Sequence, residues 1–246
     1  MHISRQFQSL AWAALAVSST QAVSIIDSLS FGHRSTISED RTTIPGWTVS
    51  GEGHDPQILS DRIILTPPYP GGKRGQIWTQ SPIDKTEFVA DVEFRASGQD
   101  RSNGNLQIWL TSGGAPAGGA INSVYTVGPF DGLVLSVDQY GGQGGKIRGF
   151  LNDGTKSYQN HHHVDSLAFG QCDYPYRNRG VPSHIRITQT GNNFAVEVDD
   201  KACFSTDKVR IAHLGISDPS NSSTGQHSSG LQIWCLRRVG REPGFI

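Results

Sequence analysis

The feature that most constrains the fold of this chain is an alternation of apolar and polar residues with a period of two. In residues 88–95, Phe88 and Val92 belong to the apolar set, whereas Asp91 and Glu93 belong to the polar set. Such alternation is typical of a β-strand with one buried and one solvated face. No stretch of twelve residues shows a sustained helical period, so the pattern predicts an all-β protein.

The same pattern recurs along the chain between glycines and prolines. Residues 193–200 repeat it, and Thr-Gly-Asn at 190–192 predicts a hairpin that joins them to a strand at 184–188. Asn-Asp-Gly at 152–154 predicts a tight turn. Further strands are predicted at residues 61–66, 76–79, 106–110, 132–138 and 146–152. About ten such strands predict a sandwich of two antiparallel sheets, large enough to bury its own core.

The charge balance and the missing motifs argue against several classes of protein. With 21 Lys+Arg and 22 Asp+Glu, the formal charge is −1, whereas a nucleic-acid surface requires a basic excess. The GxSxG, P-loop and HExxH motifs are absent. A jelly-roll glycoside hydrolase would need two carboxylates on one strand face, and Asp91 and Glu93 are the best pair. Because apolar and polar residues alternate without interruption in this strand, we interpret both carboxylates as solvated and expect no catalytic residues. A secreted hydrolase remains the alternative.

The first 22 residues have the layout of a signal peptide. A short basic segment with Arg5 precedes eight apolar residues, and Thr20 and Ala22 supply the small side chains of a cleavage site. The apolar run is too short to cross a bilayer, and no later segment is long enough to do so. We therefore expect a mature chain from residue 23 that is lumenal, or secreted if the chain is complete as written.

Three cysteines follow this segment, at positions 172, 203 and 235. In an oxidising compartment two of the three should pair. Cys172 precedes one strand pattern and Cys203 ends the next, so we predict a Cys172–Cys203 disulfide and an unpaired Cys235. Three free buried thiols are the alternative, and a metal site is disfavoured because the sequence has no CxxC pair.

Residues 130–145 are the first candidate binding region. A predicted strand ends at Asp138, and a glycine-rich loop with Tyr140 follows it. A carboxylate accepts hydrogen bonds from sugar hydroxyls, an aromatic ring stacks on a sugar face, and glycines allow close approach. The region therefore suggests a sugar contact; an Asp138 that merely caps a turn is the alternative.

Two further polar loops could carry function. Residues 160–165 read NHHHVD, and three histidines beside an acid could bind a transition metal. Adjacent residues of an extended strand face opposite sides, so only two of the three could converge, and a pH-sensitive polar loop is the alternative. Asn103 and Asn105 flank Gly104 in the third loop.

The central part of the sequence resembles the legume-like (L-type) lectin cargo receptors of the early secretory pathway, in their fungal branch. The segments that carry the resemblance are FDGLVLSVDQYGGQGGKIRGFLNDGTKSY, NHHHVDSLAFGQCDYPYRNRGVPSHIRI and NNFAVEVDDKACFS. The resemblance implies a legume-lectin-like jelly-roll sandwich that binds high-mannose N-glycans on cargo proteins travelling from the endoplasmic reticulum to the Golgi. It also implies the Cys172–Cys203 pairing. It divides the chain into a lectin-like domain at 23–217 and a divergent segment at 218–246, for which a last strand plus a truncated tail is one interpretation.

The resemblance assigns sugar contacts beyond Asp138 and Tyr140. The sugar-binding Asp of the animal members falls on Gly104, so Asn103 or Asn105 is expected to orient a hydroxyl. The sugar-contacting His of the family falls on Asn160.

The resemblance also places the family's calcium ligands. Asp138 and Tyr140 match two of them, but Gly142 replaces an Asn and His163 replaces an Asp. Calcium prefers six to eight oxygen ligands. The loss of two oxygens predicts a site with a monovalent cation or no ion rather than a calcium requirement. If the alignment slips through the histidines by a residue or two, Asp165 or His161 substitutes for the residues aligned at His163 and Asn160.

The C-terminal part departs from the full-length members of this family. They continue into a coiled-coil stalk, a transmembrane helix and a sorting tail, none of which this sequence contains. A truncated chain, a short secreted form and a lectin fold without receptor function are all open, and a membrane-anchored homologue is a further candidate partner. Asn221 begins the single N-glycosylation sequon.

Overall fold

The computed structural model describes residues 24–33, 36–67, 71–98, 104–111, 130–140, 144–158, 164–209 and 230–237. Regular structure in these residues is mainly β-strand, with a single 3-10 turn, η1 (Asp27–Leu29), and a short helix, α1 (Val164–Leu167). The described residues contain no helix that is long and apolar enough to cross a membrane. The strands are β1 (Trp47–Glu52), β2 (Gln57–Ile58), β3 (Ile63–Ile64), β4 (Lys73–Thr79), β5 (Phe88–Phe94), β6 (Asn105–Thr111), β7 (Asp131–Asp138), β8 (Lys146–Asp153), β9 (Gly170–Asp173), β10 (Ser183–Thr190), β11 (Asn193–Val198), β12 (Lys201–Thr206) and β13 (Gly230–Arg237).

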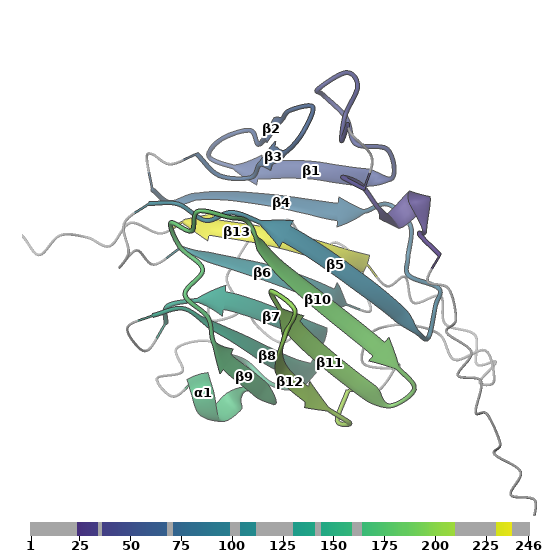
Figure 1. Ribbon diagram of the computed structural model, residues 1–246, viewed down its shortest axis with the longest axis vertical. Helices are drawn as coiled ribbons and strands as arrows, with labels where there is room; N and C mark the ends of the chain where they lie inside the picture. The colour runs from purple at the N-terminus through teal and green to yellow at the C-terminus, as the bar shows by residue number, and fades with distance from the viewer. Residues whose placement is uncertain are drawn as a thin grey trace, which may run out of the picture.

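Two antiparallel sheets form the molecule, as the alternation predicts. The larger has seven strands in the order β1-β4-β13-β6-β7-β8-β9, and the smaller has the order β12-β11-β10-β5. Figure 1 shows the smaller sheet in front of the larger one, with the β2-β3 hairpin beside β1. The prediction of an all-β sandwich is confirmed.

The last strand of the described residues, β13, lies in the middle of the larger sheet. β13 pairs antiparallel with β4 on one side and with β6 on the other. Residues 230–237, which fall in the segment at 218–246, thus complete the hydrogen-bond ladder between two strands from the first half of the chain (Figure 1).

The main core lies between the two sheets and consists of alternate residues of their strands. Leu133 and Leu135 of β7 and Ile185 and Ile187 of β10 have no exposed surface. The predicted hairpin at 190–192 is confirmed, because Thr190 of β10 pairs with Asn193 of β11.

A second, aromatic cluster covers the other face of the larger sheet. Val134 belongs to it and lies between Leu133 and Leu135 in sequence, so it points away from the main core. The strands β6 and β7 are therefore buried on both faces, apart from the first residue of β7. The cluster consists of Trp78, Trp109, Val134, Phe150 and Tyr158.

A disulfide joins the two sheets at their edges. Cys172 of β9 is bonded to Cys203 of β12, with a Cα–Cα distance of 5.3 Å. β9 is the last strand of the larger sheet and β12 is an edge of the smaller one. The predicted pairing is confirmed.

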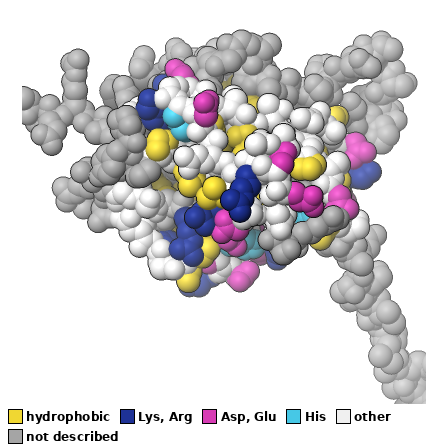
Figure 2. Space-filling model, turned by 90° about the horizontal axis from the view of Figure 1, so that it is seen from above, with side chains coloured by type: hydrophobic (Ala, Val, Ile, Leu, Met, Phe, Trp, Pro, Cys, Tyr) yellow, Lys and Arg dark blue, Asp and Glu magenta, His cyan; other side chains and the backbone are white. Residues whose placement is uncertain are grey.

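Of the strands outside the predicted ranges, β1, β9 and β12 are sheet edges, whereas β13 lies in the middle of the larger sheet. Edge strands lie beside only one neighbour and carry weaker apolar patterns. On the face seen in Figure 2, basic and acidic side chains are interspersed. Arg74 of β4 pairs with Glu52 of β1 at 3.0 Å.

Candidate functional site

The candidate site begins at the end of β7, where Asp138 closes the strand. Its carboxylate is buried and accepts hydrogen bonds from Ser136, Tyr140 and Arg148. The Ser136 hydroxyl donates to Oδ2 at 2.5 Å, and the backbone N–H of Tyr140 donates to Oδ1 at 2.9 Å. The third donor is Arg148, whose Nη1 lies 2.6 Å from Oδ1. Asp138 thus closes the turn at 138–140, as the turn-cap interpretation requires. It also pairs with the buried guanidinium of Arg148.

The pairing of β7 with β8 explains how Arg148 reaches Asp138. In this register Ser136 is opposite Arg148 and Asp138 is opposite Lys146. Side chains at every second position share a face, and diagonal neighbours across strands are within reach of a long side chain. Arg148 therefore lies diagonally from Asp138 on the same face of the sheet.

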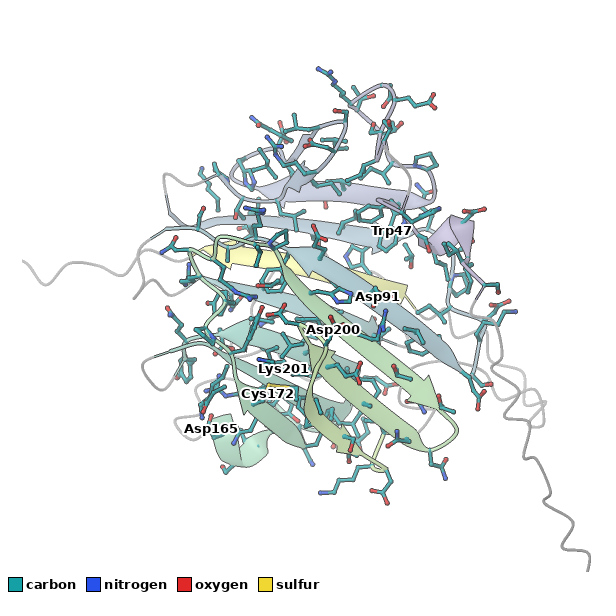
Figure 3. The ribbon with its side chains drawn as sticks, viewed as in Figure 1. Trp47, Asp91, Asp165, Cys172, Asp200 and Lys201 are labelled. Atoms are coloured by element: carbon teal, nitrogen blue, oxygen red, sulfur yellow. A yellow bond between two sulfur atoms is a disulfide. The ribbon has the colours of Figure 1, made fainter. Side chains whose placement is uncertain are left out.

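The helix α1 brings a second carboxylate to the same cation. Asp165 accepts a hydrogen bond from Nε of Arg148 at 2.7 Å and another from Nζ of Lys146 at 2.8 Å. The hydrogen bond from Lys146, joined by that from Arg148, outweighs partial burial and lowers the pKa of Asp165. Figure 3 shows Asp165 on α1 at the end of the sandwich. Asp165, one of the substitutes named for the histidine segment, is thus the acid that shares Arg148 with Asp138.

The predicted aromatic contact lies at the surface of the site. The Tyr140 side chain belongs to the exposed large hydrophobic residues, with 42% of its surface accessible. Asn105 is 93% buried at the start of β6, one residue before Leu106, which pairs with Val137 of β7. The structure therefore brings Asp138, Tyr140 and Asn105 to one end of the larger sheet.

The backbone of Gly104 is held by the segment that follows β9. The Tyr176 hydroxyl donates to the Gly104 carbonyl at 3.0 Å, and Nη2 of Arg177 donates to it at 2.7 Å. A Cβ at Gly145 would lie 2.5 Å from Cδ1 of Tyr176. Glycine at position 145 lets this ring pack against the chain between β7 and β8, so this glycine has a packing role.

Several predicted residues lie outside the described residues, and their roles stay predictions. They are the sugar-contact candidates Asn103 and Asn160, the metal candidate His163, the substitute His161, Gly142, and the glycosylation candidate Asn221.

The described residues hold no cluster of three or more His, Cys, Asp or Glu side chains that could bind a metal ion. The carboxylates suggested for a hydrolase also lack the expected environment. Partial burial raises the pKa of Asp91, but the hydrogen bond and charge of Arg186, with those of His184, outweigh it and lower the pKa. A general acid in a glycoside hydrolase needs a raised pKa. Figure 3 shows Asp91 on the smaller sheet, away from Asp165.

Arg148 is the site residue that the sequence interpretation missed. Residues 146–152 were predicted as a strand, and Arg148 lies on the same strand face as Phe150. An arginine in a strand that is buried on both faces needs an acidic partner, and this requirement was the available signal.

Known proteins resemble this chain in sequence and in fold. Residues 26–237 match the model of the legume-like lectin family. Protein EMP47 of Saccharomyces cerevisiae is 32% identical over 197 residues, which cover 75% of this chain and 42% of EMP47. This chain therefore spans less than half the length of that relative.

Two solved structures share the fold. The potassium-bound carbohydrate recognition domain of Emp46p aligns with a TM-score of 0.65 at 20% identity, covering 86% of this chain and 90% of that one. The exoplasmic/lumenal domain of VIP36 in its Ca2+/Man-bound form aligns with a TM-score of 0.67 at 18% identity, covering 86% and 84%. The sandwich is thus the legume-lectin fold, and with the family match over residues 26–237, this chain belongs to the legume-like lectin family.

Proposed function

We propose that this chain is a carbohydrate-binding domain for high-mannose N-glycans, and that it binds them at the end of the larger sheet around Tyr140. The observation that carries the proposal is the exposed Tyr140 ring directly after the buried Asp138, at the end of a legume-lectin sandwich. Aromatic faces and carboxylates are the groups that recognise a neutral sugar. A similar fold, that of VIP36, has been solved with mannose bound.

Tyr140 stacks on a sugar ring, and Asp138 fixes the turn from which Tyr140 projects. The backbone N–H of Tyr140 is bound to the Asp138 carboxylate, so the two residues act together. A hydrogen bond from a sugar hydroxyl to Asp138, and to Asn103, Asn105 or Asn160, is part of the same proposal.

The domain acts by binding, without turnover, on N-glycosylated proteins of the endoplasmic reticulum and Golgi lumen. The Cys172–Cys203 disulfide supports an oxidising compartment of this kind. Family membership supports lectin rather than hydrolase chemistry. As part of the same proposal, the domain takes part in the transport of such cargo, either by itself or together with a membrane-anchored homologue. The resemblance to cargo receptors supports this role.

A glycan array tests the site. We expect wild-type protein to bind mannose-type glycans and Tyr140→Ala to bind them roughly fivefold more weakly, since one lost ring contact is worth about 1 kcal/mol. The matched control is Val89→Ala, which truncates an exposed side chain on the smaller sheet. The assignment is contradicted if wild-type protein binds no mannose-type glycan. It is also contradicted if Tyr140→Ala and Asp138→Ala both bind as tightly as wild type. Incubation with β-glucans should release no reducing ends.

A further inference from the structure

The Arg148 side chain is almost fully buried, which is unusual for an arginine. Only 1% of its side-chain surface is accessible, and Asp138, its partner on β7, is 4% accessible. A buried guanidinium requires paired charges and satisfied donors, because its desolvation is costly. The contacts of Arg148 should therefore show what this buried charge does.

Arg148 donates hydrogen bonds to oxygens in three separate parts of the described chain. Nη1 donates to Asp138 Oδ1 at 2.6 Å, at the end of β7. Nη2 donates to the backbone carbonyl of Tyr140 at 2.7 Å, in the loop that follows. Nε donates to Asp165 Oδ1 at 2.7 Å, on α1. One planar cation thus joins a strand end, the turn with the exposed tyrosine and a helix.

These acceptors are the oxygen types that metal ions bind in proteins. Carboxylates and a backbone carbonyl are typical ligands of calcium, which takes six to eight oxygens. The resemblance places two cation ligands at Asp138 and Tyr140, and relatives with this fold have been solved with calcium and with potassium. In this chain the Asp138 carboxylate and the Tyr140 carbonyl both accept hydrogen bonds from a guanidinium.

The described residues therefore do not fit an additional cation at this place. An ion that used the same oxygens would lie a few ångströms from a positive charge that cannot be removed by deprotonation, and the two would repel each other. Lys146 adds a second positive charge, since its Nζ binds the other Asp165 oxygen at 2.8 Å.

We propose that Arg148 is a built-in cation that replaces the metal ion of the family's binding site. It is a positioning residue that orders the turn at 138–140 and α1 in the absence of any ion. For glycan binding the inference rests on the function proposed above, and it makes that binding independent of calcium and potassium.

The first experiment measures ion binding by the wild-type chain without any glycan. Thermal unfolding is followed in EDTA, in millimolar calcium and in 100 mM-scale potassium, beside an inert salt at equal ionic strength. We expect the Tm to be unchanged within about 1 °C and calorimetry to show no calcium binding. A Tm raised by calcium or potassium beyond the inert salt overturns the proposal, whether or not the protein binds glycans.

The second experiment removes the guanidinium. Arg148→Ala leaves Asp138 and Asp165 without their shared cation, so we expect a lower Tm than wild type and a Tm that now rises with calcium or potassium. The matched control is Arg186→Ala, which removes an arginine paired with Asp91 on the smaller sheet and should leave the ion response unchanged. An Arg148→Ala variant with the stability of this control, or with no response to either ion, overturns the proposal.

A conservative variant and a glycan measurement complete the test. If Arg148→Ala does not fold, Arg148→Lys keeps the charge without the planar fork; it should fold with a reduced Tm, and wild-type stability overturns the proposal. Wild-type glycan binding should be equal in EDTA and in calcium. Binding only in calcium overturns the inference, whereas an ion-insensitive chain that binds no glycan overturns the proposed function alone.

Discussion

Gly149 and Gly170 show how single residues shape the edge of the larger sheet. They are opposite each other in the β8–β9 pair, and a phenylalanine ring occupies the space next to each. A Cβ at Gly149 would lie 2.5 Å from Cζ of Phe169, and a Cβ at Gly170 would collide with the Phe204 ring. The glycines therefore admit two rings to the core beside the disulfide.

Replacement of Gly149 by alanine should destabilise the fold. The added methyl group must displace the Phe169 ring, and overpacking of this kind typically costs about 1–3 kcal/mol. Urea unfolding measures the change in the free energy of unfolding. Gly180→Ala is the matched control because a Cβ at Gly180 meets no atom within 4 Å. Equal losses in the two variants would contradict this explanation.

Asp165 makes part of the stability of the site dependent on pH. Its pKa is lowered in the folded chain by Lys146 and then by Arg148, against partial burial. The stabilisation is therefore fully present above the unfolded pKa of about 3.9 and is lost as the pH falls through the lower folded pKa. The effect is small because 47% of the side-chain surface is accessible.

We expect Asp165→Asn to lower the Tm at neutral pH and to match wild type at the acid end of the titration. Thermal unfolding from about pH 7 down to about pH 2 measures the difference between the two proteins. Asp84→Asn, which changes an exposed carboxylate beside Lys85, serves as the control. A difference between Asp165→Asn and wild type that does not change with pH would rule out this role.

At the scale of elements, the edge strands depend on covalent and side-chain links. β9 has one neighbour in its sheet, β8, and β12 has one neighbour, β11. The disulfide joins these two edges across the sandwich. Because it closes a loop between residues separated by 31 positions, it restricts the unfolded chain considerably.

Removal of the disulfide should lower stability substantially. For Cys172→Ala combined with Cys203→Ala we expect a loss of roughly 3–4 kcal/mol in the free energy of unfolding. Denaturant unfolding with and without a reducing agent measures it, and only the wild-type midpoint should fall on reduction. An unchanged midpoint in the double variant would show that the bond adds no stability.

At the scale of the whole molecule, the larger sheet is completed by the end of the chain. β13 pairs with both β4 and β6, so the hydrogen-bond ladder of the larger sheet is interrupted between these two strands until residues 230–237 are in place. Without this strand, two interior strands would expose unpaired backbone groups, which favours aggregation.

A chain that ends at Ser217 should therefore fail to fold cooperatively, whereas a chain that ends at Gly240 should fold. Circular dichroism and size-exclusion chromatography distinguish a cooperative monomeric fold from an aggregate. A cooperative transition with equal midpoints in the two chains would show that the lectin domain ends before β13.

The sequence by itself determined the features that depend on residues close together in the chain. The period of two predicted β5, β7, β10 and β11 because the alternation of side chains belongs to each strand alone. The disulfide was predictable from its neighbouring strands. Asp138 and Tyr140 could be proposed together as a candidate site because they are only two residues apart.

Only the tertiary structure decided the order of the strands and the chemistry beneath Tyr140. β13 enters between β4 and β6, which are far from it in sequence, and no periodicity encodes the choice of partner. Arg148 binds Asp138 and Asp165 because strand register and the position of α1 bring them within hydrogen-bond distance. The role of a buried charge depends on the groups that it contacts. For Arg148 these groups are Asp138 and Asp165, which only the packing of distant segments brings to it.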